Sequence, residues 1–375
     1  MNKYSFEHTI QPRKGSNDAL LIQVLDGLMS RYLDRVPDAN RAVSLFTKKG
    51  DQIINDHIAF RSIHIESILK IFLHLGYTVR MNDATNRPFN FESKKLTAVW
   101  LKHKNENAPR IFVSQFRFTQ GSKELQNIVS AYLSNWKDPI DQLDLNDANA
   151  INEYLHTAQW PTPTYADYKA IQEESEYVSW VLYNKYYLNH FTLSVHELAS
   201  FEFNQELNIV LKNYQDSYKR NPEDSVLKDA RQMMKRKYKK QFFEFNQMLI
   251  DHGFNMNKVK DGVMNISEDA CLLQSSTQSA MVNASFPDGD FLIPGSYVEF
   301  AYRGINDNIV DQLITNHLTM ADVKPNMRRD GFETQNADNI FESTYIGVQK
   351  KGHESKSAYE ESCQNLQQFL LLYGN

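Results

Sequence analysis

The sequence has little cysteine: Cys271 and Cys363 are the two thiols in 375 residues. Two thiols cannot form a disulfide framework, so we expect both to be free in a reducing compartment. No apolar run approaches the roughly 18–20 residues that span a bilayer. The first residues, MNKYSFEHTIQPRKGSNDALL, also lack the apolar run that follows the basic residues of a signal peptide. We therefore expect a cytoplasmic protein without a membrane partner.

An excess of positive charge is also missing. The 41 basic and 46 acidic residues give a net charge of −5, whereas general nucleic-acid binders are basic. Residues 218–242, YKRNPEDSVLKDARQMMKRKYKKQF, form one locally basic segment. Acidic residues open this segment, and Met233 and Met234 interrupt its charges, which favours a solvated amphipathic helix. We expect no nucleic-acid partner, and the sequence does not indicate an oligomeric state.

Apolar residues, in contrast, are plentiful. Hydrophobic residues make up 41% of the chain and aromatic residues 12%, enough for a packed core and against extensive disorder. At this length the chain could hold two or three domains, or one duplicated fold with insertions.

The order of expected elements favours the duplicated fold. Residues 1–56 are expected to be helical, and 57–120 read as a strand, a helix ended by Gly76, and further strands, which is a βαβββ-like unit. After a helical insert at 121–189, residues 190–303 repeat this order with an inserted helical stretch. Residues 304–375 form a C-terminal segment, and we expect the whole chain to make one domain.

Three expected strands carry polar side chains opposite an apolar face. In NDHIAFRS, His57 and Arg61 share one face while Ile58 and Phe60 share the other, because side chains alternate along a strand. In the same way, His190 in LNHFTLSV shares a face with Thr192 and Ser194. The third strand, SYVEFAYR, places Glu299 between Val298 and Phe300.

A carboxylate on such a core strand needs a partner, because an unpaired buried charge costs several kcal/mol. A divalent cation is one such partner. Two imidazoles and one carboxylate on one face of an ion form the facial triad of non-haem Fe(II) oxygenases. The sequence does not show that His57, His190 and Glu299 converge, however. Hydrogen-bonded core histidines and an ion pair between Glu299 and Arg303 remain alternatives.

Arg61 would suit a substrate that carries a carboxylate. It follows His57 by four residues on the same strand face, and a guanidinium binds a carboxylate through two parallel hydrogen bonds. An ion pair with an acidic neighbour such as Glu66 is the alternative.

Four segments, DHIAFRS, LNHFTLSV, LLQSST and IPGSYVEFAYRG, occur in this order between about residues 55 and 303. Together they resemble the family of 2-oxoadipate dioxygenase/decarboxylases, also called hydroxyglutarate synthases. The resemblance implies an α+β, vicinal-oxygen-chelate-like fold in which paired βαβββ units form a curved sheet around a metal, with added helical segments. It also implies ferrous iron (Fe²⁺) held by His57, His190 and Glu299, with Arg61 binding the substrate.

The reaction implied by the resemblance converts a 2-oxo dicarboxylic acid and O2 into a 2-hydroxy acid one carbon shorter and CO2. For 2-oxoadipate the product is 2-hydroxyglutarate, a step in lysine catabolism. The tail is harder to align with the family, and TQNADNIFESTY is the segment we expect to complete the substrate pocket, with Asn336 and Ser343 as contacts. We expect Gln274, Ser276 and Thr277 to hydrogen-bond the metal ligands; ordinary polar residues of a strand are the alternative.

Two other functions fit the same residues. A metal-dependent isomerase or an extradiol-type dioxygenase would keep the fold and the metal, because a fold does not fix a reaction. A metal-free protein that binds a small molecule would keep the scaffold alone. Both predict a different response to 2-oxoadipate, and the second predicts no bound iron.

Overall fold

The computed structural model describes residues 4–82, 85–157, 159–201, 203–259, 262–332 and 356–373. Two helices open the chain, α1 (Asp18–Arg35) and α2 (Pro37–Lys48). The first buries an apolar face with helical spacing that includes Leu21, Leu25 and Leu28. Pro37 stands in the first turn of α2, where its missing N–H costs no helical hydrogen bond.

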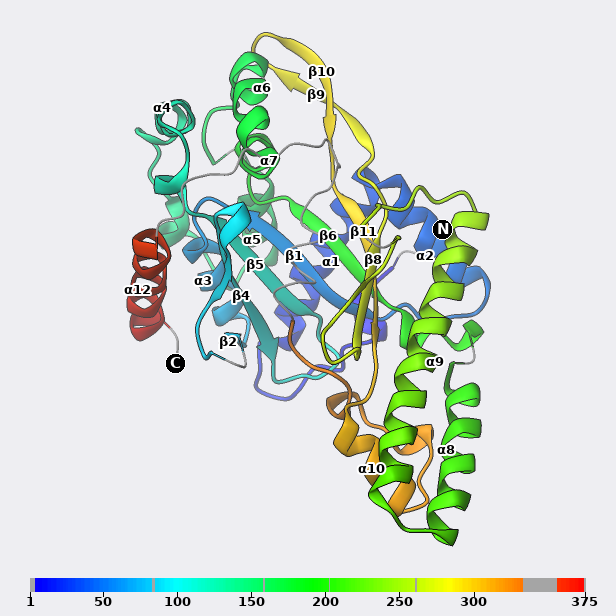
Figure 1. Cartoon of the computed structure of the whole chain (residues 1–375). Coiled ribbons are helices and arrows are strands. Elements are labelled where there is room, and N and C mark those ends of the chain that lie inside the picture. The colour runs from blue at the N-terminus through cyan, green and yellow to red at the C-terminus, as the bar shows by residue number, and fades with distance from the viewer. Residues whose placement is uncertain are drawn as a thin grey trace.

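The centre of the molecule is a nine-stranded mixed sheet in which the path β2-β4-β5-β1-β6-β11-β8-β7 is joined by β3 at β4 (Figure 1). The first half of the sheet and its helix are β1 (Asn55–Ser62), α3 (Glu66–His74), β2 (Tyr77–Arg80), β3 (Phe89–Phe91), β4 (Leu96–His103) and β5 (Arg110–Phe116). The second half and its helices are β6 (Leu188–Ser194), α8 (Phe203–Arg220), α9 (Asp224–Asp251), β7 (Asn265–Ile266), β8 (Leu272–Ser276) and β11 (Tyr297–Arg303).

The two halves have the same connectivity. In the first, β1 pairs parallel with β5, which pairs antiparallel with β4. In the second, β6 pairs parallel with β11, which pairs antiparallel with β8. The opening strands β1 and β6 lie antiparallel at the centre and join the halves into one sheet. The structure therefore confirms the predicted α+β class and the repeated element order.

The remaining elements surround this sheet. Between the halves the chain forms the helices α4 (Lys123–Leu133), α5 (Ala148–His156), α6 (Tyr165–Glu174) and α7 (Glu176–Asn184). Each begins at a Ser, Thr or Asp whose side-chain oxygen accepts a hydrogen bond from a backbone N–H of the first turn. A two-stranded ribbon, β9 (Met281–Phe286) and β10 (Gly289–Pro294), projects from the second half (Figure 1). The last helices are α10 (Asp307–Thr315) and α12 (Lys356–Tyr373).

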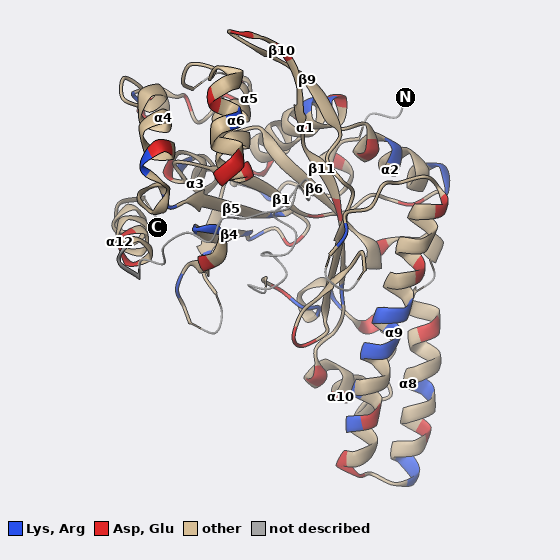
Figure 2. Ribbon diagram, turned by 45° about the horizontal axis from the view of Figure 1, so that its top comes forward, with Lys and Arg blue, Asp and Glu red and all other residues tan. Residues whose placement is uncertain are grey.

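The locally basic segment differs from its sequence prediction. Instead of one helix over 218–242, α8 ends at Arg220 and α9 begins at Asp224, because Pro222 and its neighbours interrupt the helical hydrogen bonds. The basic side chains of α9 are interspersed with acidic ones (Figure 2). Several of them form ion pairs with neighbouring elements: Arg231 with Asp311, Lys235 with Asp307, and Lys237 with Glu206.

The sheet has one apolar and one polar face near its centre. Aromatic side chains from three helices cover the apolar face: Tyr32 of α1 lies against Phe191, Phe72 of α3 against Phe60, and Phe245 of α9 against Phe300. The other face of β1, β6 and β11 carries the histidines, the glutamate and the arginines named above. Within the described ranges, no helix combines the length and apolar character that crossing a lipid bilayer requires.

Candidate metal centre

The sheet register brings His57, His190 and Glu299 together. His57 pairs with Thr192 across β1 and β6, and Thr192 pairs with Glu299 across β6 and β11. His190 stands two residues before Thr192 and therefore points to the same face. His57 Nε2 lies 3.2 Å from Glu299 Oε1, and His190 Nε2 lies 3.6 Å from Glu299 Oε2. One ligand atom from each residue lies within 4.8 Å of the others.

Hydrogen bonds fix the orientation of both imidazoles. His57 Nδ1–H donates to Asp56 Oδ2 at 2.8 Å, and His190 Nδ1–H donates to Asn189 Oδ1 at 3.0 Å. With Nδ1 as the donor, Nε2 of each ring faces the shared space and offers its lone pair to a metal in the neutral form of the ring. Such outer hydrogen bonds are typical of histidines that bind metals, since they fix the tautomer and raise the basicity of the ligand.

A β-bulge allows Asp56 to reach His57. The pairing of β1 with β6 shifts register between Asn55 and His57, and a bulge of this kind redirects a side chain that regular alternation would send to the opposite face. Asp56 itself is 3% exposed. Its carboxylate accepts two hydrogen bonds from Arg303, from Nε at 2.6 Å and from Nη2 at 2.9 Å.

The carboxylate of Glu299 is held in its ionised form. Burial raises its pKa, but the neighbouring His190 and His57 and a hydrogen bond from Gln274 bring the pKa below its ordinary value. Burial lowers the pKa of His190 to about 3, and the nearby His57 and Arg61 contribute in the same direction. A neutral imidazole and an ionised carboxylate are the forms that bind a metal.

The donor set therefore fits a divalent transition metal. Two imidazole nitrogens and a carboxylate, all buried, converge from three adjacent strands. This combination is typical of non-haem iron sites that keep positions open for substrate and O2. Thr192 Oγ1 lies 3.0 Å from His57 Nε2 and 3.3 Å from Glu299 Oε1, so the hydroxyl also borders the centre of this group.

Arg61 lies at the end of the site where His190 and Tyr297 pair across β6 and β11. Its guanidinium is 1% exposed and is held over two aromatic rings of α7, 5.3 Å from the Tyr177 centroid and 5.5 Å from that of Trp180. Burial raises the pKa of Tyr297, and a hydrogen bond between its side chain and Arg61 acts in the opposite direction. Arg61 thus shares the buried polar face with the three donors.

The other residues predicted at the site differ from one another in their contacts with the metal ligands. Gln274 Nε2 donates to Glu299 Oε1 at 2.8 Å. Ser276 pairs with Glu299 in the backbone register, while the hydroxyl of Thr277 accepts a hydrogen bond from the Val298 N–H. Asn336 and Ser343 lie outside the described residues.

Sequence reasoning missed Asp56, Asn189 and Arg303. For the first two a signal exists: an Asp or Asn directly precedes each histidine, in Asp56-His57 and Asn189-His190. The sequence offers Glu299 as an ion-pair partner of Arg303, whereas in the structure the guanidinium donates two hydrogen bonds to Asp56.

Residues 24–322 match the family model described as 2-oxoadipate dioxygenase/decarboxylase. A rice protein named 2-oxoadipate dioxygenase/decarboxylase, chloroplastic/amyloplastic, is 30% identical over 344 residues, which cover 87% of this chain and 79% of the relative.

Two solved structures show where the fold recurs. The structure of a rice hydroxyglutarate synthase in complex with 2-oxoadipate superposes with a TM-score of 0.68 at 29% identity and covers 90% of this chain and 96% of its own. A glyoxalase superfamily protein from Ralstonia eutropha reaches a TM-score of 0.57 at 18% identity, covering 79% of this chain and 87% of its own. The second likeness concerns the fold alone and agrees with the predicted vicinal-oxygen-chelate-like arrangement.

Proposed function

Because this chain belongs to the 2-oxoadipate dioxygenase/decarboxylase family, we propose that it converts 2-oxoadipate and O2 into 2-hydroxyglutarate and CO2 with ferrous iron as cofactor. The equation balances without a further reductant, because loss of CO2 from the 2-oxo acid supplies the electrons. CO2 leaves with the oxygen atoms of the original carboxylate, and both atoms of O2 enter 2-hydroxyglutarate, one in the new carboxylate and one in the hydroxyl group. The observation that carries the proposal is the convergence of His57 Nε2, His190 Nε2 and a carboxylate oxygen of Glu299 at one buried point.

In this proposal His57, His190 and Glu299 hold the metal, and Asp56, Asn189 and Gln274 orient them. When bound, ferrous iron supplies the activation of O2 and the binding of the 2-oxo acid group that the reaction requires. Three protein ligands would leave the remaining coordination positions to these two reactants. The facial triad also favours iron over a structural zinc site, which would use four protein ligands.

Arg61 binds the distal carboxylate of the substrate in this proposal. The charges of the buried site support a dicarboxylic acid: a divalent metal, the Glu299 carboxylate and the Arg61 guanidinium together carry two positive charges, and 2-oxoadipate carries two negative ones. A matched total matters here, because an uncompensated charge is expensive in a buried site. The aromatic support from Tyr177 and Trp180 limits the movement of the guanidinium and so sets the substrate length that fits.

Aromatic side chains would exclude water from the reaction. Phe332 lies against the His57 ring with centroids 4.9 Å apart, and it also contacts Phe112 at 5.2 Å and Trp100 at 5.8 Å. Together they form an apolar wall on the His57 side, while Tyr177 and Trp180 stand on the Arg61 side. Excluding water protects reactive intermediates from side reactions.

An oxygen-uptake assay tests the proposal. Protein purified without oxygen and loaded with ferrous iron should consume O2 with 2-oxoadipate and release 2-hydroxyglutarate and CO2 in equal amounts, as measured by mass spectrometry and by trapping of the gas. Comparison with 2-oxoglutarate and longer 2-oxo acids identifies the preferred chain length. Uptake with catechols and none with any 2-oxo acid would favour the extradiol-type alternative. Ligand binding that persists without any metal would favour the binding protein.

We also propose that the reaction serves lysine catabolism in the cytoplasm. The free thiols Cys271 and Cys363 support a reducing compartment, although the rice relative is named as a plastid protein. Accumulation of 2-oxoadipate after deletion of the gene, together with fractionation of the source cells, tests both parts.

A further inference from the structure

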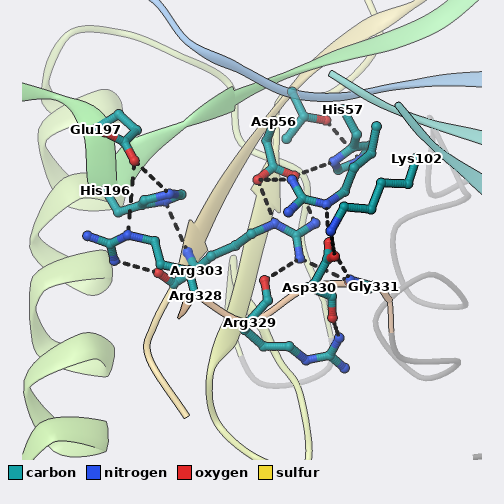
Figure 3. Close-up of polar contacts among 12 residues, drawn as sticks. Asp56, His57, Lys102, His196, Glu197, Arg303, Arg328, Arg329, Asp330 and Gly331 are labelled. Atoms are coloured by element: carbon teal, nitrogen blue, oxygen red, sulfur yellow. Dashed lines mark hydrogen bonds and ion pairs between the residues drawn. The ribbon is translucent and has the colours of Figure 1, made fainter. Parts of the chain in front are cut away.

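A buried arginine joins the metal centre to the segment that leads into the C-terminal part of the chain. We call residues 328–332 the closing segment, because they end at Phe332, whose ring packs against His57. Arg303 is 1% exposed and stands on β11, four residues after Glu299. Its guanidinium lies between Asp56 and the closing segment (Figure 3).

One edge of the Arg303 guanidinium contacts Asp56, the residue that orients His57. Nε and Nη2 of Arg303 donate to the two carboxylate oxygens of Asp56, and Asp56 Oδ2 also accepts the Nδ1–H of His57. Such a two-point contact fixes the plane of the carboxylate. The orientation of the His57 ring therefore depends on Arg303 through Asp56.

The other side of the Arg303 guanidinium contacts the backbone of the closing segment. Nη1 of Arg303 donates to the carbonyl oxygens of Arg329 at 3.0 Å and of Gly331 at 2.9 Å. Gly331 has a φ of +73°, a left-handed conformation that glycine adopts without steric cost. Asp330, between them, accepts hydrogen bonds from Lys102 and Arg110, each at 2.6 Å (Figure 3).

Stability alone is a weak reason for this arrangement. A buried ion pair loses so much hydration that a well-packed apolar pair often serves as well. The geometry instead points to a coupling: we propose that Arg303 is a positioning residue through which the metal bound by His57 and the seated closing segment stabilise each other. This inference rests on the proposed metal site, and it goes beyond it by assigning a role to Arg303, Asp56 and Phe332.

The coupling has two directions, because linkage between two binding events is reciprocal. When the closing segment is seated, Arg303 and Phe332 hold Asp56 and the His57 ring in the orientation that binds the metal. When the metal is bound, the fixed His57 ring gives Phe332 a defined surface to pack on. Loss of Arg303 should therefore weaken metal binding and, separately, remove the effect of metal on the closing segment.

The substitution Arg303→Lys tests the coupling, because lysine keeps the charge but cannot contact Asp56 and two carbonyls at once. A matched control is available in the same chain. Arg231 on α9 makes the same two-point contact with Asp311 of α10, at 2.8 and 2.6 Å, on elements that carry none of the three donors and in a less buried setting. Arg231→Lys therefore controls for the general loss of an Arg–Asp pair.

Two measurements are made on each protein with Mn²⁺, a redox-stable probe: the affinity for the ion by calorimetry, and amide hydrogen exchange of a peptide spanning 328–332. We expect Mn²⁺ to slow this exchange in the wild type and in Arg231→Lys. In Arg303→Lys we expect an affinity about 10–100-fold lower and no effect of Mn²⁺ on the exchange. An affinity equal to that of the control, or exchange that responds to Mn²⁺ as in the wild type, would overturn the coupling.

Phe332→Ala keeps the test valid if Arg303→Lys does not fold. It keeps the side chains that form the hydrogen bonds between Arg303 and Asp56, and it removes the ring that packs against both His57 and the Arg303 guanidinium. We therefore expect a several-fold loss of Mn²⁺ affinity; an unchanged affinity would contradict the coupling. The outcome is separate from that of the oxygen-uptake assay. Turnover of 2-oxoadipate with normal Mn²⁺ binding by both variants would refute the coupling alone, whereas coupled Mn²⁺ binding without turnover would refute the proposed reaction alone.

Discussion

Replacing Arg61 with lysine should selectively impair the use of dicarboxylic substrates. The guanidinium is 1% exposed, so its interaction with a substrate carboxylate takes place away from water. A hydrogen bond to a charged group contributes about 1.5–3 kcal/mol. Lysine retains a single ammonium in place of the planar donor pair, and it loses the support of Tyr177 and Trp180.

The expected loss is therefore about 2–3 kcal/mol in the free energy of binding, which corresponds to a KM about 30–150-fold higher. The effect on kcat should be smaller, because the contact is made in both the ground state and the transition state. Arg61→Met should exceed this loss, since it leaves the substrate carboxylate in the buried site without a charged partner.

Steady-state oxygen uptake with two substrates distinguishes a specific loss of carboxylate binding from a general disruption of the active site by the substitution. 2-Oxoadipate carries the distal carboxylate, whereas 2-oxohexanoate has the same chain length and ends in a methyl group. Arg61→Lys should lose most of its preference for 2-oxoadipate while turnover of 2-oxohexanoate changes little. Equal losses with both substrates, or an unchanged KM for 2-oxoadipate, would remove Arg61 from the substrate site.

Three further predictions concern the metal ligands and the fold. Glu299→Gln, nearly isosteric, should abolish the stoichiometric iron measured by plasma emission in protein purified without oxygen; full iron content would exclude Glu299 as a ligand. Gln274→Leu removes the 2.8 Å hydrogen bond to Glu299 and should weaken Mn²⁺ binding about 10-fold or more in calorimetry, and an affinity unchanged from wild type would count against this role. Burial lowers the pKa of Lys185 to about 7 from its ordinary 10.5, so between these pH values the unfolded chain holds a proton that the folded chain lacks, and stability rises with pH. From pH 6 to 9 the wild type should gain about 2–3 kcal/mol relative to Lys185→Met in urea unfolding; parallel pH profiles would show that the Lys185 pKa is not depressed.

The sequence predicts which side chains share a face of each strand, but it does not predict which strands pair with one another. The period-two alternation in NDHIAFRS and LNHFTLSV places His57, Arg61 and His190 opposite the apolar residues, and the structure agrees. That β1, β6 and β11 lie side by side depends on which strands pair, and no local pattern specifies this. The resemblance to the family supplied what the spacing of 133 and 109 positions could not.

The ion-pair partner of Arg303 is a second feature that the sequence did not predict. The pattern of β11 alone places Glu299 and Arg303 on one face, which favours an ion pair between them. They stand four residues apart, however, which is about 13 Å of strand. The carboxylate that Arg303 contacts is that of Asp56 on β1, and β6 lies between β1 and β11 in the sheet. A bulge that the sequence did not reveal turns Asp56 toward Arg303. Long-range pairing and local irregularity together decided this contact.

Diffraction at the iron absorption edge tests the metal centre most directly. Crystals of the wild-type protein loaded with ferrous iron should show one anomalous peak bound by His57 Nε2, His190 Nε2 and a carboxylate oxygen of Glu299, at distances of about 2.0–2.3 Å. The peak should vanish at energies just below the edge. An iron peak located elsewhere, or none at these three side chains in protein that turns over 2-oxoadipate, would contradict the assignment.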